Sequence, residues 1–232
     1  MGRCANPPYG AIEDEPMSEW QDKWVREYLQ PRYPELVPSY LKATEIVDSA
    51  LKSGFLAPDH MDLLSSFARS PRSPLGENVA SMIGVLADHF EVARDAVRTL
   101  ASNAKLHARV NALVALSSHA RSGLHNEILS AALTDRSSKV RELAADKIMG
   151  FGLRELLPEI ESAIEREEKT KTRATLEWER DLLRDGFRAI DQSNGSIRIT
   201  CRTKGGVIST SFSNGEFETK GREWIAKHRR AD

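Results

Sequence analysis

Cysteine is scarce in this sequence, with Cys4 and Cys201 as the only two. Two cysteines so far apart form no disulfide framework, and a reducing cytosol is therefore the compartment that we expect. The CxxC and HExxH ligand spacings are absent, as are the GxSxG pattern of serine hydrolases and the GxxxxGK pattern of phosphate-binding loops. We therefore expect no metal site, no cofactor and no catalytic residues, and the sequence favours a protein that is not an enzyme.

Long apolar runs are also missing. None approaches the roughly 18 residues that would span a bilayer, and the first residues lack the basic start and apolar core of a signal peptide. The net charge is only -1, so no overall field attracts nucleic acid or a membrane surface. Hydrophobic residues at 40% and charged residues at 29% are typical of a globular protein. We expect no contact with membranes.

A repeat with a spacing of 32 residues occupies the middle of the chain. The Ile, Ser and Ala at positions 128, 130 and 131 recur at 160, 162 and 163. Three arginines share the same spacing, and each follows a polar residue by six positions: Asn103 and Arg109, Asp135 and Arg141, Glu167 and Arg173. We expect three pairs of helices at about 90–121, 122–153 and 154–187, and a period of this length with paired helices is typical of a solenoid.

A second spacing of the repeat is also compatible with the sequence. The segment 97–101 matches 140–144 at a spacing of 43 residues. We prefer the spacing of 32 because it aligns three units and keeps the helices alternating.

The repeated segments resemble HEAT repeats. LLPEIESAI at 156–164 is similar to the first helix of that family's unit, and TDRSSKVRELAADKIMG at 134–150 is similar to its loop and second helix. The resemblance implies an α-α superhelix in which loop aspartates and helix arginines form a ladder between neighbouring repeats. Carried over, the ladder consists of Asn103, Arg109, Asp135, Arg141, Glu167 and Arg173. Two of the three acidic positions depart from aspartate, which makes the expected ladder irregular.

The ends of the chain differ from its middle. Residues 1–16 have no periodicity and are expected to form a flexible leader, and 17–190 to form the helical solenoid. Trp20, Trp24 and Tyr28 share one helical face, which we expect to pack against the next helix rather than to bind a base or a peptide. The segment SPRSPLGEN at 70–78 is predicted to be a linker.

The composition changes after residue 190. Residues 191–232 are predicted to form a three-stranded meander from SIRITCRT, VISTSF and EFET, followed by a short terminal helix in GREWIAKHRR. So small a sheet needs something to pack on, and we expect it to cap the last helix pair.

Several side chains are candidates for binding. In HEAT-like solenoids the second helices line the concave surface, and residues 90–154 carry 10 Lys and Arg against 6 Asp and Glu. The candidates are Lys105, His107, Lys139, Lys147 and Trp178. His107, His119 and His125 lack metal-ligand spacing and are interpreted as surface residues of a basic ridge. The carboxylates Glu177, Glu179 and Asp181 around Trp178 are interpreted as a charged helix face rather than as an acid–base pair.

Three functions remain open. The first is a protein-binding solenoid that grips its partner in the concave face, with an inhibitor or immunity-type protein as the example that we consider. The second is a nucleic-acid-binding protein of HEAT-like fold, related to DNA repair. The third is a structural subunit of a larger complex in which the C-terminal strands form the docking edge.

Overall fold

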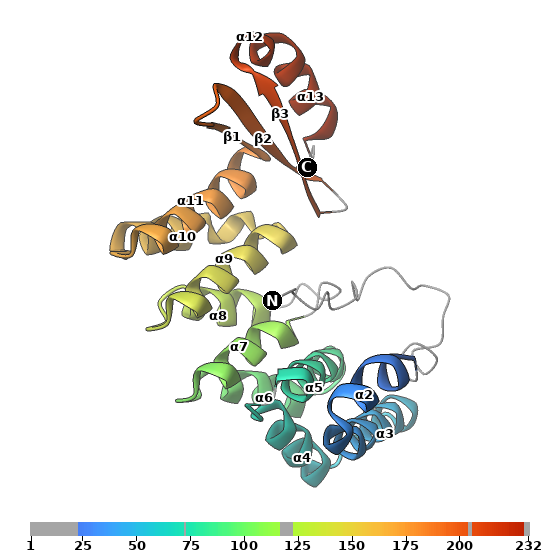
Figure 1. Cartoon of the computed structure of the whole chain (residues 1–232). Coiled ribbons are helices and arrows are strands. Elements are labelled where there is room, and N and C mark those ends of the chain that lie inside the picture. The colour runs from blue at the N-terminus through green and yellow to red at the C-terminus, as the bar shows by residue number, and fades with distance from the viewer. Residues whose placement is uncertain (1–22, 72, 117–122, 204–205, 230–232) are drawn as a thin grey trace. The chain divides into compact units, whose positions relative to one another are not determined.

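The computed structural model describes residues 23–71, 73–116, 123–203 and 206–229. The fold is mainly helical, with a small antiparallel sheet near the C-terminus, as expected from the sequence (Figure 1). The chain divides into two compact units, Met1–Arg121 and Ser122–Asp232. The predicted leader at 1–16 and Trp20 lie outside the described residues. Within these ranges, no helix has both the length and the apolar character needed to cross a bilayer.

The first unit is helical throughout its described part. Its elements are η1 (Val25–Leu29), α2 (Gln30–Arg32), η2 (Pro34–Leu36), α3 (Val37–Ser53), α4 (Pro58–Ala68), α5 (Ser73–Ala87), α6 (Glu91–Ala101) and α7 (Leu106–Ala115). Trp24 of the aromatic stripe packs on α3 as predicted, because its ring centroid lies 4.9 Å from that of Tyr40. Trp24 also stacks on Tyr28, with 5.4 Å between the ring centroids.

Helix α5 is the centre of the first unit and packs against α3, α4, α6 and α7. The prediction of a linker at 70–78 is wrong, because α5 begins at Ser73 inside that segment. Proline is compatible with the first turn of a helix, and Pro74 occupies it. The side-chain amide of Asn78 then donates to the Pro74 carbonyl at 2.6 Å, within the helix.

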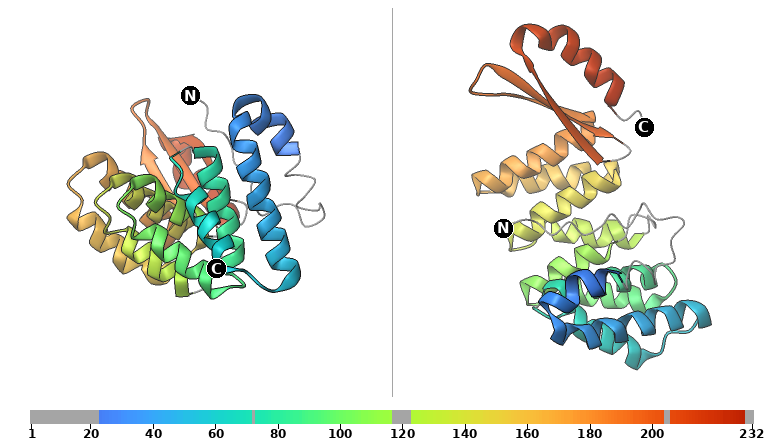
Figure 2. Two further views of the ribbon diagram at one scale, coloured as in Figure 1. Left: turned by 90° about the horizontal axis from the view of Figure 1, so that it is seen from below. Right: turned by 45° about the vertical axis from the view of Figure 1, so that its right-hand side comes forward.

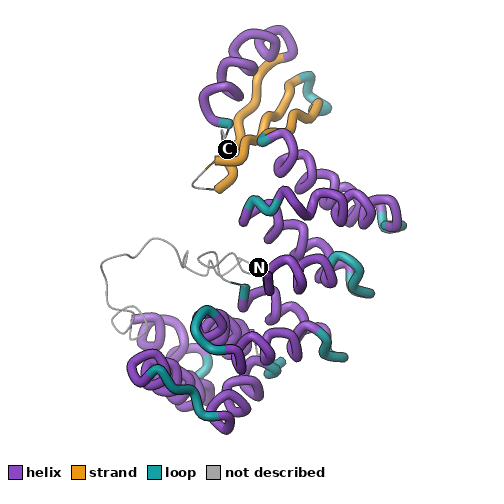
Figure 3. Tube along the Cα trace, turned by 180° about the vertical axis from the view of Figure 1, so that it is seen from behind, coloured by secondary structure: helices purple, strands orange, loops and turns teal. Residues whose placement is uncertain are grey.

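The second unit begins with two pairs of helices. The first pair is α8 (Gly123–Ala132) and α9 (Ser138–Phe151), and the second is α10 (Leu157–Arg166) and α11 (Thr170–Asp185), with η3 (Arg154–Leu156) between the pairs. Together with α6 and α7, these pairs occupy the three expected segments, and short loops join the helices of each pair (Figure 3). Helices α9 and α11 lie side by side. Ala144 and Ala145 are fully buried, and such small side chains let neighbouring helices approach closely.

The second unit ends in a meander of three antiparallel strands (Figure 2). These are β1 (Phe187–Asp191), β2 (Ser196–Thr203) and β3 (Gly206–Ser213), in the order β1-β2-β3. The elements that follow are α12 (Asn214–Glu216), η4 (Phe217–Gly221) and α13 (Arg222–His228). Ile199 and Cys201 of β2 are fully buried, and Phe217, Trp224 and Ile225 pack against them from the helical segment. The sheet and its C-terminal helix therefore share a small core.

Two strand predictions are corrected. The strand β1 was expected to be helical, and the EFET segment, expected to be a strand, is helical. Glu216 and Lys220 form an ion pair of 2.7 Å at the i, i+4 spacing of a helix. Phe217 and Ile225 share one helical face toward the sheet, which outweighs the short alternating pattern. The terminal helix predicted at GREWIAKHRR is confirmed as α13.

Candidate functional site

The three loops that join the helices of each pair have the same local hydrogen bond. In each loop a side-chain oxygen accepts from the backbone N–H two residues further on, which keeps the turn in one conformation. These bonds run from Lys105 to Asn103 (2.9 Å), from Ser137 to Asp135 (2.7 Å) and from Lys169 to Glu167 (3.0 Å). A glutamate at the third position forms the bond as the asparagine and the aspartate do.

The three repeated arginines make a second hydrogen bond to each of these loops. Each guanidinium donates to the backbone carbonyl six residues before it: Arg109 to Asn103 (3.0 Å), Arg141 to Asp135 (2.6 Å) and Arg173 to Glu167 (3.0 Å). The polar residue of the loop and the arginine of the second helix are therefore brought together in all three pairs. The contact uses the backbone carbonyl of the polar residue, and the sequence pattern alone does not specify this.

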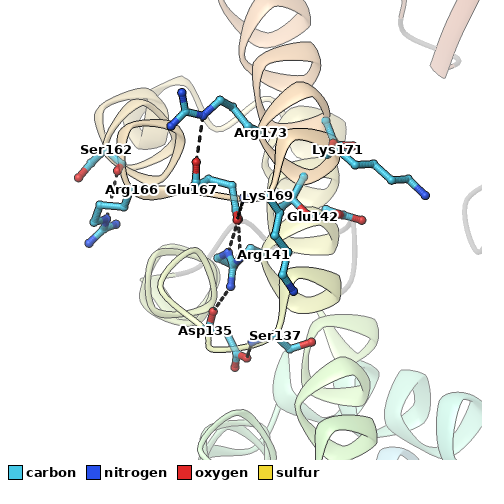
Figure 4. A network of polar contacts seen from close by, with 12 residues as sticks. Asp135, Ser137, Arg141, Glu142, Ser162, Arg166, Glu167, Lys169, Lys171 and Arg173 are labelled. Atoms are coloured by element: carbon cyan, nitrogen blue, oxygen red, sulfur yellow. Dashed lines mark hydrogen bonds and ion pairs between the residues drawn. The ribbon is translucent and has the colours of Figure 1, made fainter.

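One further contact connects two helix pairs. The Nε of Arg141 donates to the Oε2 of Glu167 at 2.8 Å, and its Nη2 donates to the same oxygen (Figure 4). The Glu167 side chain is only 2% exposed and that of Arg141 15%. Burial opposes the ionisation of Glu167, but the Lys169 N–H and the Arg141 guanidinium outweigh it and hold the Glu167 pKa below its usual value. This charged pair fixes α9 and its loop to the following pair of helices.

The binding candidates of the second unit have different surroundings. Lys139 is exposed and, within the described residues, makes no ion pair. Lys147 is half-buried, with its ammonium 5.4 Å from the centre of the Phe151 ring. Burial lowers the pKa of Lys147, although the charge of Asp146 opposes the shift. Lys139 is thus open to a ligand, whereas Lys147 packs along its own helix.

Trp178 faces the sheet of its own unit. The guanidinium carbon of Arg188, on β1, lies 5.3 Å from the centre of the Trp178 ring, within the range of a cation–π contact. The Nε of Arg188 also lies 3.6 Å from Asp181 on α11. Trp178 therefore takes part in packing β1 against α11.

Glu179 is the exception in the charged segment around Trp178. The interpretation of a charged helix face is wrong for this residue, since Glu179 is buried, with 7% of its surface exposed. Its Oε2 is buried and accepts no hydrogen bond from any residue that the structure describes. Burial, with a smaller effect from the charge of Asp146, raises the pKa of Glu179 to about 7. The reason is the packing of α11 on α9, in which Leu176 and Leu183, on the same face as Glu179, are fully buried.

A basic pocket of about 600 Å³ lies in the first unit and includes the candidate Lys105. We name it the Arg69–Lys105 pocket. Its described lining contains two cations and no carboxylate: Ser66, Phe67, Arg69, Ser70, Pro71, Leu75, Asn103 and Lys105. The pocket lies between the end of α4 and the loop before α7, two segments far apart in the sequence. Arg69 was not among the predicted site residues, because no sequence pattern connects it to Lys105.

Two side chains of α7 hold the end of α4 in place. His107 Nε2 hydrogen-bonds to the Arg69 carbonyl at 2.8 Å, and Asn111 Nδ2 donates to the Ala68 carbonyl at 2.7 Å. His107 thus positions a wall of the pocket. The surface interpretation is wrong for His125, which is buried with its ring centroid 5.3 Å from that of Phe151. His119 lies outside the described residues.

No three His, Cys, Asp or Glu side chains in the described part of the chain gather into a group that could hold a metal ion. Comparison with protein-family models, with curated proteins and with solved structures found no match to this chain.

Proposed function

We propose that this chain is a HEAT-like helical-repeat protein of non-enzymatic function that binds another protein in the cytoplasm. The observation that carries the proposal is the recurrence of the same two hydrogen bonds in three successive loops, at the 32-residue spacing of the sequence repeat. Repeated helix pairs bury their apolar faces against their neighbours and present extended surfaces to partners. The buried free thiol of Cys201 suits a reducing compartment.

The exposed face of α9 and α11 is the proposed contact surface in the second unit. Lys139, Asp146 and Lys171 are exposed there, and Glu142 is half-buried. Glu142 and Lys171 point away from α10 (Figure 4). This mixture of charges favours a protein partner with complementary charges over the uniformly negative backbone of nucleic acid. An enzyme or toxin that the chain inhibits, as an immunity-type protein does, is the partner that we propose.

Purification of the tagged full chain from its native cells, after mild cross-linking, tests this function. We expect one protein to be recovered in a stoichiometric amount. The double variant Lys139→Glu/Lys171→Glu reverses two charges on the proposed surface and should lose that protein. The matched control Glu161→Lys/Glu165→Lys reverses two exposed charges on α10 and should retain it.

Two results would contradict the proposal. In the first, no stoichiometric protein is recovered in low salt. In the second, the variant and its control lose the partner equally, which would remove α9 and α11 from the contact surface.

Nucleic-acid binding is the second candidate, and the paired cations of the Arg69–Lys105 pocket favour it. Binding to duplex DNA should then fall steeply as salt rises, and Lys105→Glu should weaken it for all sequences alike. The absence of DNA binding in low salt would eliminate this candidate.

A further inference from the structure

Arg69 and Lys105 differ from the ion-paired arginines of the same unit. Elsewhere in the first unit, Arg94 and Arg98 form ion pairs with carboxylates of their own helix. Within the described residues, the side chains of Arg69 and Lys105 take part in no ion pair and no hydrogen bond, yet both line one pocket. The described lining of the pocket holds no carboxylate beside these two cations, so it would attract a bound anion.

The backbone around the pocket adds to this positive potential. Lys105 is the N-cap residue of α7, and no side chain in the described part of the chain caps that end of the helix. The first N–H groups of a helix carry a partial positive charge that favours anions. Asn103 Oδ1 already accepts from the Lys105 N–H, which leaves the Nδ2 of Asn103 as a further donor beside the cations.

The walls of the pocket are held in position before any ligand binds. The hydrogen bonds from His107 to Arg69 and from Asn111 to Ala68 join α7 to the end of α4, and Asn111 is buried. Residues separated by 38 and 43 positions in the sequence are connected in this way. A preformed site of this kind binds with less loss of conformational entropy.

The pocket also has an apolar part. Phe67, Pro71 and Leu75 line it beside the two cations, and its volume of about 600 Å³ lies within the range of small-molecule sites. An inorganic anion would leave this apolar lining unused. A phosphate attached to a flat or apolar group would use both parts.

We propose that the Arg69–Lys105 pocket binds a phosphate monoester carried on a flat or apolar group, of the size of a mononucleotide. Arg69 and Lys105 hold the phosphate, and Phe67 and Leu75 contact the carried group. This site is separate from the proposed protein-binding surface, so either proposal can fail without the other.

Nuclear magnetic resonance titration of the full chain tests the proposal with three probes: adenosine monophosphate, inorganic phosphate and adenosine. We expect adenosine monophosphate to shift the amide signals of Arg69 and Lys105 saturably, and more tightly than inorganic phosphate does. Adenosine should cause no such shift, and added salt should weaken the binding.

Substitutions then identify the cations that hold the phosphate. Arg69→Gln and Lys105→Gln should each weaken the binding of adenosine monophosphate about tenfold. Lys52→Gln, which removes an exposed charge from α3 in the same unit, should leave the affinity unchanged. If Arg69→Gln fails to fold, the exposed Lys105 decides the question alone.

Four results would overturn the proposal. They are the absence of saturable shifts with adenosine monophosphate in low salt, equal binding of adenosine, equal binding of inorganic phosphate, and an affinity that Arg69→Gln and Lys105→Gln both leave unchanged.

Discussion

At Arg141, one guanidinium makes two kinds of contact. It binds the carbonyl of Asp135 in its own loop and the carboxylate of Glu167 in the next pair. The spacing of six residues predicted the first partner, since it recurs at all three arginines. The expected ladder included Glu167 but did not pair it with Arg141, and the structure supplies that second partner. Neither the use of the Asp135 carbonyl nor the near-complete burial of Glu167 can be obtained from spacing, because both depend on how α9 meets the following loop.

Substitution of Arg141 by alanine should therefore lower stability. Removing it leaves the buried carboxylate of Glu167 without its guanidinium partner and the loop carbonyl without its donor. We expect a loss of about 1–3 kcal/mol in the free energy of unfolding, measured by urea denaturation. Lys139→Ala, two residues earlier on α9 at an exposed position, is the matched control and should change stability by less than about 0.5 kcal/mol. Equal stability of the two variants would show that the Arg141–Glu167 pair contributes nothing.

Glu179 gives the second unit a distinct dependence on pH. Its pKa rises to about 7 in the folded chain from an ordinary value of 4.5, because burial disfavours the charged form. Below pH 4.5 the carboxyl is protonated in both the folded and unfolded states, so its ionisation does not change the folding stability there. As the pH rises from 4.5 to 7 the unfolded chain ionises first, and folding stability falls by up to roughly 3 kcal/mol.

The Glu179→Gln variant should remove this loss. Its stability relative to the wild type should increase between about pH 5 and pH 8, as measured by thermal unfolding across that range. Glu177→Gln is the control on the same helix, at a half-buried position, and should follow the pH profile of the wild type. Parallel profiles for wild type and Glu179→Gln would mean that the carboxyl is solvated in solution.

At the scale of the elements, the distance between two packed helices decides whether a glycine between them can be replaced by a larger residue. Gly84 lies on α5, the centre of the first unit, and a Cβ at this position would overlap the backbone carbonyl of Ala115 on α7. Gly84→Ala should therefore separate the two helices and destabilise the protein by about 1–3 kcal/mol, measured by chemical denaturation.

Gly150 offers the opposite case within α9. Apart from the backbone of its own helix, a Cβ there would meet no atom of the described residues within 4 Å. Gly150→Ala should raise stability by about 0.5–1 kcal/mol, because alanine loses less conformational entropy in a helix than glycine. A Gly84→Ala variant as stable as Gly150→Ala would show that α5 and α7 do not pack so closely.

The elements also show which parts of the fold the local sequence pattern can predict. The three helix pairs were predictable because each of their helices has ten or more residues and an apolar face. The short strand β1 was not, since its five residues follow α11 after a single glycine and become a strand only through pairing with β2. The linker at 70–78 was mispredicted because Pro74 is compatible with either a turn or a first helical turn. The Arg69–Lys105 pocket was unpredictable beyond Lys105, because α4 and α7 meet only in the folded unit.

At the scale of the whole molecule, the C-terminal sheet can either cap the last helix pair or serve as a docking element for a partner. Three contacts favour the cap. The Arg202 N–H donates to the Gly186 carbonyl at 2.9 Å, the Arg202 guanidinium lies against Gly152 at the end of α9, and Arg188 stacks on Trp178. These contacts cover surface of α9 and α11 that would otherwise meet water.

Deletion of residues 187–232 distinguishes the two roles. If the sheet is a cap, the shortened chain should aggregate or unfold at a lower temperature, because the ends of α9 and α11 lose their cover and apolar surface is exposed. Arg188→Ala, which removes only the stack on Trp178, should cause a smaller decrease in the same direction. The measurements are the unfolding temperature and the apparent mass in solution. A shortened chain that stays monomeric and unfolds at the wild-type temperature would rule out the cap and favour a docking role. The first surface to test for docking is then the edge of β3, because none of its eight residues carries a charge that would block pairing with another strand.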